Sequence, residues 1–245
     1  MNRARKDPAY DSIFHAPRCV LNGKITGSRR FAAQSYDLKR IRAVCTAFGT
    51  TVNDVVMTMC ATALRTYLMN QDALPTKPLV AMVPVSLRTD DSSGGNQVGI
   101  ILASLGTHLN DAAERLRYIH EDVKASKQRY AAMSPEEILN YTALLLAPAS
   151  FNLLTGLAPK WQTFNVVISN VPGPKEPSYW NGARLEGMYP VSIAMDRIAL
   201  NMTLTSYCDQ VEFGLIGCRR PLPSLQRMLD YLEDGLTELE PPAGL

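Results

Sequence analysis

The stretch from Phe164 to Pro177, FNVVISNVPGPKEP, combines a strand with an abrupt stop. Residues 164–169 alternate between two faces and are rich in β-branched side chains, which favours a half-buried strand. Pro172 and Pro174 then fix φ and remove two N–H donors, and Gly173 between them can adopt positive φ. The pattern predicts a rigid loop at a strand end, where α/β proteins tend to place ligand sites. A structural turn without a functional role explains the same residues. The rest of the sequence is needed to choose between a turn and a ligand site.

The composition is that of an ordinary soluble protein. A chain of 245 residues can form one large domain or two small ones, and 46% hydrophobic with 20% charged residues is typical of globular proteins. The net charge of +2 gives no general sign of a nucleic-acid partner. Residues 1–42 are more basic, with ten Lys or Arg against three Asp or Glu. Such a segment attracts phosphates or an anionic membrane surface, or is a solvated leader.

The cysteines and the apolar segments indicate in which cellular compartment the protein is expected. The five cysteines are odd in number and none are spaced as CxxC, so neither a zinc site nor a disulfide framework is predicted, and a reducing cytoplasm is expected. The basic first residues lack the apolar segment of a signal peptide. Residues 138–161 carry no charge before Lys160 but are interrupted by proline, glycine and asparagine, so no membrane span is predicted.

The chain reads as amphipathic helices and apolar strands without an internal repeat. The hydrophobic period predicts helices over residues 37–48, 53–69, 111–130, 135–147 and 221–239. It predicts strands over residues 30–35, 78–87, 98–107, 164–169, 184–192, 198–207 and 211–217. Because strand and helix alternation is incomplete and a meander closes the chain, the expected fold class is α/β (α+β), a mixed sheet covered by helices.

For one predicted strand and one predicted helix, the sequence is compatible with more than one position in the fold. The strand 78–87 is nearly all apolar and is expected to be central, yet Pro84 cannot donate to a ladder and suggests an edge position or a bulge. The helix after the capping box of Ser134 and Glu137 is apolar on most faces. It is therefore expected to be deeply buried in the core or to line an apolar channel.

Common catalytic motifs are absent from the sequence. No GxGxxG or P-loop follows a strand, and there is no GxSxG nucleophile elbow. His15, His108 and His120 form neither HxxxD nor HExxH, and neither His15 nor His108 has a carboxylate positioned in sequence to mark it as a base. His120 is expected to be a surface or boundary residue. The residues alone therefore predict no complete acid–base or nucleophilic machinery.

Five segments occur in a specific order and spacing: TVNDVV at 51–56, PLVAMVPVSLR at 78–88, VVISNVPGPKEP at 166–177, GARLEGMYPVS at 182–192 and ALNMTLTSY at 199–207. Together they resemble the C-terminal half of the bacterial wax ester synthase/acyl-CoA:diacylglycerol acyltransferases. The likeness covers roughly residues 17–239.

The resemblance implies an enzyme of two chloramphenicol-acetyltransferase-like domains, each a mixed sheet flanked by helices, with the active-site channel between them. The catalytic base of the family lies in an HHxxxDG motif of the first domain, and the 245 residues contain no such motif. The chain is therefore expected to be the second half. The expected parts are a flexible leader (1–17), a linker with a short strand (18–35), the acyltransferase-like domain (36–239) and a tail (240–245).

Two family motifs carry over to numbered residues. Asn53 and Asp54 match the ND motif, although a helix cap with no direct chemistry explains the same pair. In the SNVPGP motif, Ser169 and Asn170 are expected to donate a hydrogen bond to the oxyanion of acyl transfer. The residues expected to contact substrate are Pro172, Gly173, Pro174 and Asn201.

The resemblance implies transfer of a fatty acyl group from acyl-CoA, as a substrate, to diacylglycerol or a long-chain alcohol, with no cofactor and no metal. Without HHxxxDG, activity is expected to need a separate N-terminal half. The alternative is an inactive truncated remnant that binds lipid, CoA or a partner acyltransferase. A cytoplasmic location, with peripheral contact to a membrane or lipid droplets and with no nucleic acid, completes the expectation.

Overall fold

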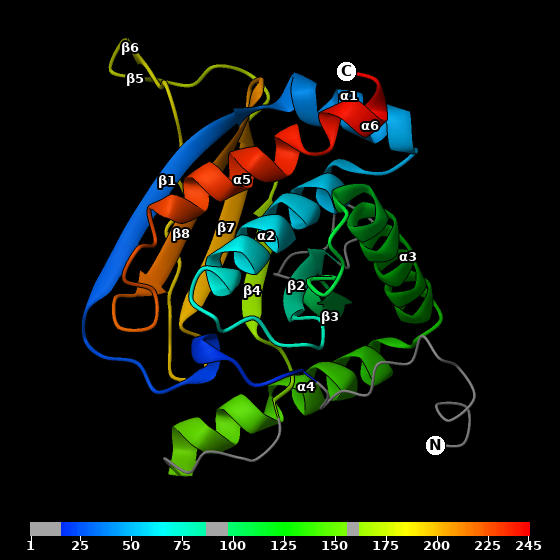
Figure 1. The fold of residues 1–245 in the computed structure, drawn as a ribbon. Helices are drawn as coiled ribbons and strands as arrows, with labels where there is room; N and C mark the ends of the chain where they lie inside the picture. Colours follow the sequence, from blue (N-terminus) through cyan, green and yellow to red (C-terminus); the bar gives the residue numbers. More distant parts are fainter. Residues whose placement is uncertain (1–15, 87–97, 156–161) are drawn as a thin grey trace.

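The computed structural model describes residues 16–86, 98–155 and 162–245, and its centre is a six-stranded mixed sheet (Figure 1). The strand order is β1-β8-β7-β4-β2-β3, and β4 pairs in parallel with both β7 and β2 while the other neighbours are antiparallel. The predicted mixed sheet is confirmed. The strands are β1 (Arg29–Asp37), β2 (Val80–Ser86), β3 (Val98–Ser104), β4 (Val166–Val171), β7 (Leu200–Tyr207) and β8 (Gln210–Cys218).

Helices pack against one face of this sheet, and the caps predicted at Gly49 and Asp111 are confirmed. Gly49 ends α1 in the left-handed region with φ of +65°. Asp111 caps α3 by accepting a hydrogen bond from the Glu114 N–H at 2.7 Å. Three of these helices lie within a residue of their predicted bounds. The helices of this layer are α1 (Leu38–Phe48), α2 (Val52–Met69), α3 (Ala112–Ala131) and α5 (Arg227–Thr237).

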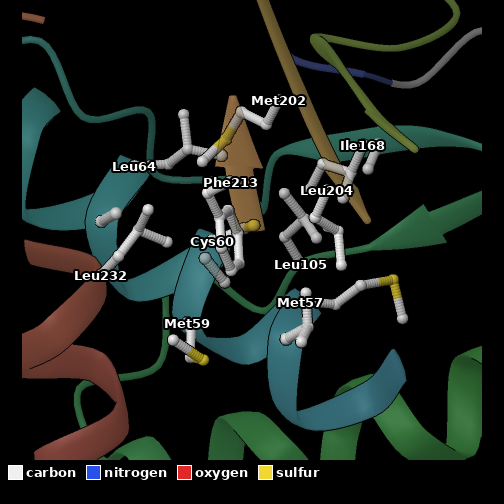
Figure 2. Close-up of a cluster of buried hydrophobic side chains, with 14 of the residues drawn as sticks. Met57, Met59, Cys60, Leu64, Leu105, Ile168, Met202, Leu204, Phe213 and Leu232 are labelled. Carbon is white, nitrogen blue, oxygen red and sulfur yellow. The ribbon is translucent and has the colours of Figure 1, made fainter. Parts of the chain in front are cut away.

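The main hydrophobic core lies between the helix layer and the sheet (Figure 2). The α2 helix is buried along most of its length and forms the centre of this core. Burial of many large apolar side chains is the dominant favourable term in folding, at roughly 25 cal/mol per Å² of apolar surface. Labelled members of this cluster are Met57, Met59, Cys60, Leu64, Leu105, Ile168, Met202, Leu204, Phe213 and Leu232.

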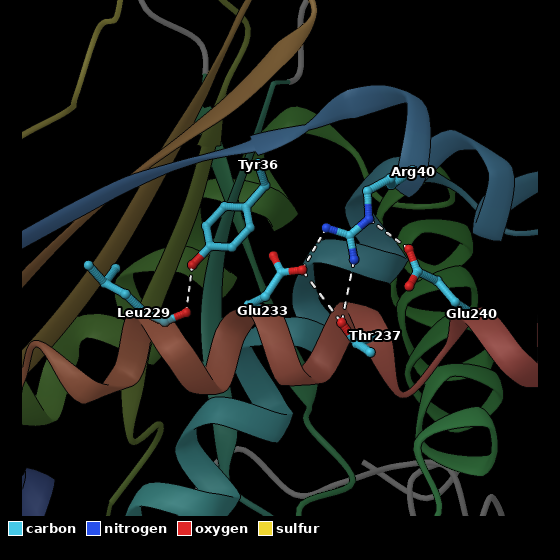
Figure 3. Close-up of polar contacts among 6 residues, drawn as sticks. All are labelled: Tyr36, Arg40, Leu229, Glu233, Thr237 and Glu240. Carbon is cyan, nitrogen blue, oxygen red and sulfur yellow. Dashed lines mark hydrogen bonds and ion pairs between the residues drawn. The ribbon is translucent and has the colours of Figure 1, made fainter. Parts of the chain in front are cut away.

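The end of the chain differs from the prediction in two ways. The last long helix begins at Arg227 and not at 221, because Pro221 and Pro223 lie in turns and lack the N–H donors of a helix interior. Residues 240–245, expected to be a tail, contain the short helix α6 (Glu240–Ala243). Arg40 of α1 holds this end by contacting Glu240 at 2.7 Å, as Figure 3 shows.

The predicted strand over residues 184–192 is wrong. The described chain has only a small hairpin there, β5 (Tyr179–Trp180) with β6 (Ala183–Arg184), and it extends away from the sheet in Figure 1. Residues 185–194 run without regular pairing across the sheet face that the helix layer leaves free. Pro190 within this run cannot donate to a strand ladder.

Pro84 occupies an interior strand without breaking the sheet. The predicted central position of β2 is confirmed, since it lies between β4 and β3, and the expectation of an edge strand is wrong. The Val80 N–H and C=O both point to the β4 side, so the backbone of Pro84 points to that side too. The ladder between β2 and β4 extends only to Met82, so among the described residues no ladder acceptor faces the proline that lacks an N–H donor.

The α4 helix (Pro135–Thr155) is not deeply buried, and the prediction of a core helix is wrong. Its capping box is as predicted, since the Ser134 N–H donates to Glu137 Oε2 at 2.8 Å. In Figure 1 its N-terminal part lies near the end of α3, where the rings of Tyr141 and Tyr130 are in contact. Leu145 is buried, but Leu139 and Leu154 are 69% and 84% exposed. An apolar helix is buried only where another surface covers it, and the described residues cover one side.

The β1 strand is an integral part of the sheet, although residues 18–35 were expected to be a linker. It pairs with β8 along its whole length, from Arg29 opposite Cys218 to Asp37 opposite Gln210. Of the expected leader 1–17, the structure describes only the last two residues. Among the described helices none is by itself long and apolar enough to cross a membrane, and only α1 with α2, bent by 104°, meets that test as a pair.

Candidate functional site

A cavity of about 480 Å³ lies on the sheet face opposite the helix layer, and we call it the sheet cavity. The strands β2, β4 and β7 form its floor, Leu146 of α4 lies on one side and residues 191–195 lie on the other. Most of its lining is apolar. The lining residues are Met82, Pro84, Leu146, Phe164, Val167, Ser169, Val171, Val191, Ser192, Ile193, Met195, Ile198, Asn201 and Thr203.

Three polar side chains of β4 and β7 meet in the floor of the sheet cavity. Ser169 is the register partner of Thr203, and Asn201 is the partner of Val167. Thr203 Oγ1 donates a hydrogen bond to Asn201 Oδ1 at 2.9 Å. That bond leaves the Asn201 amide nitrogen as a donor within an apolar surface. The structure thus brings the predicted residues Ser169 and Asn201 together.

Sequence reasoning missed Thr203, although a signal was present. Successive side chains of a strand point to opposite faces, so Asn201 and Thr203 share one face of β7. A predicted strand over 198–207 with polar residues at every second position, 201, 203 and 205, could have indicated a polar row. No comparable signal in the sequence indicates that residues 191–195 cover this row.

The segment 189–195, which we call the strap, is held on the sheet by a polar chain and a close backbone contact. Tyr189 Oη lies 2.9 Å from Ser35 Oγ, and Ser35 Oγ donates to the buried carboxylate of Glu212. A Cβ at Gly214 would lie 1.8 Å from the Pro190 carbonyl oxygen, so the strap rests directly on β8. These contacts position one wall of the sheet cavity.

The loop after β4 is bound tightly to the end of β7. A Cβ at Gly173 would lie 2.1 Å from the Ser206 carbonyl oxygen. Gly173 does not adopt positive φ, so close approach and not backbone conformation explains the glycine. Thr205 Oγ1 also donates to the Val171 carbonyl at 2.8 Å, and the Cys208 N–H donates to the Pro174 carbonyl at 3.1 Å.

The other predicted residues of this motif do not line the sheet cavity. Asn170 pairs with Leu204, whose side chain belongs to the main core, so Asn170 lies on the helix-covered face at the strand end. Pro172, Gly173 and Pro174 follow Val171, the last residue of β4 that lines the sheet cavity, and are not among its lining residues. Contact of these three residues with substrate remains a prediction. In the structure, the loop packs against the end of β7.

Asn53 and Asp54 lie at the start of α2, on the opposite side of the sheet from the cavity. The N-cap is Thr51, and Asp54 completes a capping box by accepting from the Thr51 N–H at 2.9 Å. Asp54 Oδ2 also lies 2.9 Å from His120 Nδ1 of α3. The capping box accounts for the contacts of Asp54 with Thr51 but not for its contact with His120. The pair with His120 was missed because the two residues are far apart in sequence.

Three of the cysteines and the potential metal ligands add no chemistry to the site in the part of the chain that the structure describes. Burial raises the pKa of Cys19 and of Cys45 to about 11 in each case, and it raises the pKa of Cys60 further. These thiols are therefore protonated at neutral pH and are poor nucleophiles. Within the described ranges, no three His, Cys, Asp or Glu side chains gather as ligands for a metal ion.

Solved structures of distant proteins define the class of fold. The epimerization domain of tyrocidine synthetase B superposes with a TM-score of 0.60 at 10% identity, over 99% of this chain and 56% of that chain. A condensation domain of the enacyloxin polyketide synthase gives a TM-score of 0.55 at 14% identity, over 96% of this chain and 48% of that chain. The fold is therefore chloramphenicol-acetyltransferase-like, of the condensation type.

Within this class, the chain belongs to the wax ester synthase/diacylglycerol acyltransferase family. Residues 94–240, more than half of the chain, match the WS/DGAT C-terminal domain. Residues 1–56 match the wax ester synthase/diacylglycerol acyltransferase catalytic domain. The expected leader and linker thus fall within a region that has counterparts in the family.

Individual relatives agree with this assignment. A solved wax ester synthase/diacylglycerol acyltransferase from Marinobacter aquaeolei VT8 is 72% identical, with a TM-score of 0.85 over 100% of this chain and 54% of that chain. The O-acyltransferase WSD of Acinetobacter baylyi is 50% identical over 96% of this chain and 51% of its own length. A putative diacylglycerol O-acyltransferase of Mycobacterium tuberculosis is 53% identical over 95% of this chain and 52% of its own length. The chain spans about half the length of these relatives.

Proposed function

We propose that this chain supplies the second half of an O-acyltransferase that moves a fatty acyl group from acyl-CoA to a diacylglycerol or a long-chain alcohol. One observation carries the proposal: the sheet cavity has a mostly apolar lining, and the polar side chains Ser169, Asn201 and Thr203 lie together in its floor. An apolar wall suits an acyl chain, and a few placed donors suit its reacting carbonyl. The family membership gives the reaction type.

The proposed reaction needs a base that the 245 residues do not contain as HHxxxDG. A histidine of a first-domain polypeptide removes the proton from the acceptor hydroxyl, and the alkoxide oxygen attacks the thioester carbonyl. The tetrahedral intermediate then expels the CoA thiolate, which takes the proton back from the histidine. No cofactor enters this sequence of steps.

The proposed contribution of this polypeptide is to stabilise the oxyanion and to enclose the fatty acyl chain. Ser169 Oγ and the Asn201 amide are the donors that can face a developing negative charge in the sheet cavity. A donor placed in a water-excluded site is worth more than in water, and loss of one typically costs about 10²–10³ in kcat. Asn170 is a weaker candidate because it lies on the other face of the sheet.

The test is transfer of labelled acyl-CoA to diacylglycerol and to a long-chain alcohol, with this chain alone and with a first-domain polypeptide carrying HHxxxDG. We expect turnover only with both present. Ser169→Ala and Asn201→Ala are each expected to lower kcat about 10²-fold, whereas Ser150→Ala on exposed α4 leaves it unchanged. Unchanged kcat in both cavity variants would exclude the oxyanion role.

The alternative is a non-catalytic chain that binds lipid or CoA, and the lack of HHxxxDG within the sequence favours it. It predicts saturable binding of a fatty acid or CoA without turnover in either condition. Contact with a membrane or lipid droplet belongs to the same proposal and is measured by flotation with diacylglycerol-containing vesicles.

A further inference from the structure

A second cavity, of about 180 Å³, lies on the same sheet face near the start of β2, and we call it the basic cavity. Val80 and Ser104, which are register partners on β2 and β3, form part of its floor. The two cavities are adjacent. Phe164 lines the sheet cavity and the preceding residue, Thr163, lines the basic cavity; Met82 lines the sheet cavity and its register partner on β3, Leu102, lines the basic cavity. The α4 helix contributes Tyr141 to one cavity and Leu146 to the other.

The charges that line the basic cavity favour an anion. Lys77 and Arg129 provide two cations, and Asp122 is the one carboxylate in the lining. Asp122 Oδ2 accepts a hydrogen bond from the Ser104 N–H at 2.9 Å, so one of its oxygens is engaged with the backbone of β3. The lining as a whole keeps an excess of positive charge, and phosphate groups are bound by such donors.

One buried hydroxyl in the lining lacks a partner. Thr163 is 4% exposed, and its Oγ1 makes no hydrogen bond to any described residue. A buried polar atom without a partner costs about 1–3 kcal/mol, so native structures rarely keep one without a reason. A bound oxygen-rich group in the basic cavity would satisfy this hydroxyl.

The surrounding contacts hold the cavity walls in place. Arg129 donates to Ser126 Oγ at 2.8 Å, and Ser126 Oγ in turn contacts the Leu102 carbonyl at 3.4 Å. The ring of Tyr141 lies edge-on to Tyr130 with centroids 5.8 Å apart. The guanidinium and the aromatic wall are thus positioned by α3 and β3 before any ligand binds.

We propose that the basic cavity binds a phosphate group of the CoA portion of the acyl donor. This inference rests on the proposed function, since acyl-CoA is the phosphorylated substrate of that reaction. The position supports it: a basic cavity and an apolar cavity lie next to each other on one sheet face, along one helix, as an amphiphile with a phosphorylated head and an acyl chain requires.

The test is direct binding by calorimetry to the 245-residue chain at fixed ionic strength, with adenosine 3′,5′-bisphosphate, CoA and dephospho-CoA as probes. These probes carry no acyl group, so binding is measured independently of turnover. We expect Lys77→Gln and Arg129→Gln each to weaken CoA binding about tenfold, the effect of losing one charge-assisted hydrogen bond. Lys124→Gln, which removes an exposed cation of α3 outside the lining, is the matched control and is expected to leave binding unchanged.

Thr163→Val separates a ligand contact from a structural defect. A methyl group in place of an unpartnered hydroxyl leaves the fold as stable or more stable. If the hydroxyl binds phosphate, the same change weakens CoA binding. Equal CoA affinity in Lys77→Gln, Thr163→Val and the parent chain would overturn the proposal even if acyl transfer occurs. Binding of phosphatidate vesicles or of inorganic phosphate that depends on Lys77, without binding of CoA or the bisphosphate, would overturn it in favour of a lipid headgroup or a free phosphate.

Discussion

At the scale of single residues, the loop after β4 depends on a glycine for reasons of space. Gly173 meets the Ser206 carbonyl and Thr205 Oγ1 where a Cβ would be, and both belong to β7. Because one of these neighbours is backbone, it cannot move aside as a side-chain end would. The tight contact places Val171 and Ser169 in fixed positions at the edge of the sheet cavity.

Gly173→Ala is therefore expected to lower the free energy of unfolding by about 1–3 kcal/mol, as overpacking of a close contact does. Urea unfolding followed by circular dichroism measures the change. Gly27→Ala is the control, because a Cβ at Gly27 meets nothing within 4 Å. Equal stability of the two variants would show that the loop can move away from β7.

Tyr36 makes stability depend on alkaline pH. Burial raises the pKa of Tyr36 above its ordinary value of 10.0, and Glu233 raises it further, while its hydroxyl donates to the Leu229 carbonyl at 2.8 Å. The unfolded phenol ionises from about pH 10 upward, whereas the folded one stays protonated. The unfolded state thus loses a proton first, and stability falls as pH rises above 10.

Tyr36→Phe is expected to lower stability at pH 8 by about 1 kcal/mol, the usual net value of a hydrogen bond. It is also expected to reduce the decline in stability between pH 9.5 and 11. Urea midpoints across that range measure both effects. A decline as steep as in the parent chain would assign the titration to other groups, such as Tyr67, whose pKa burial also raises.

At the scale of elements, one arginine connects three helices. Arg40 of α1 contacts Glu233 of α5 at 2.6 Å and Glu240 of α6 at 2.7 Å, and Thr237 lies within reach at 3.4 Å (Figure 3). The side chains of the two ion pairs are 23–38% exposed, so water screens the charges. The contact differs from a single surface ion pair chiefly because one planar guanidinium reaches two carboxylates at once.

Arg40→Lys is expected to cost nearly as much stability as Arg40→Ala, about 1 kcal/mol, because an ammonium group cannot reach two carboxylates in the planar geometry of a guanidinium. Thermal unfolding at low and high salt measures the loss. If the lysine variant keeps the stability of the parent chain, charge alone holds α6.

The sequence allowed prediction of elements whose own side chains determine them. The amphipathic period and caps of α1, α2 and α3 gave their bounds, and the apolar run of β2 gave its central position. Elements that depend on distant partners were missed. Pro84 is tolerated only because the β4 ladder stops early, and α4 is exposed because little of the described chain covers it.

The same distinction holds for the candidate site. Ser169 and Asn201 could be named from the motif and the strand pattern. Thr203 follows from the same alternation. The strap, the contact of Asp54 with His120 and the exclusion of Asn170 from the cavity depend on register and on chain crossings. No local pattern in one sequence encodes those.

At the scale of the whole molecule, α4 leaves an apolar surface in solvent. Leu139, Leu144, Phe151 and Leu154 are 44–84% exposed. Several large apolar side chains exposed on one helix favour association. The isolated chain is expected to sediment as a concentration-dependent mixture of monomer and larger species.

Leu139→Lys with Leu154→Lys is expected to shift that mixture toward monomer. Analytical ultracentrifugation from low to high micromolar concentration measures it. Met69→Lys, at a residue 49% exposed on α2, serves as the comparison, because it adds a charge away from α4. A monodisperse monomer of the parent chain at every concentration would contradict the prediction.

The pairing of β1 with β8 has a consequence for how the chain folds during synthesis. β1 is an edge strand whose one neighbour in the sheet is β8, and Arg29 lies opposite Cys218, so the pairing joins segments far apart in the sequence. Pairings between such distant residues form late and slow the folding of a domain. While the ribosome is still translating the segment before β8, β1 and β7 each lack a neighbour, and unpaired strand edges promote aggregation. Nascent chains stalled before residue 210 should therefore bind chaperones longer than chains stalled after residue 218 has emerged from the exit tunnel.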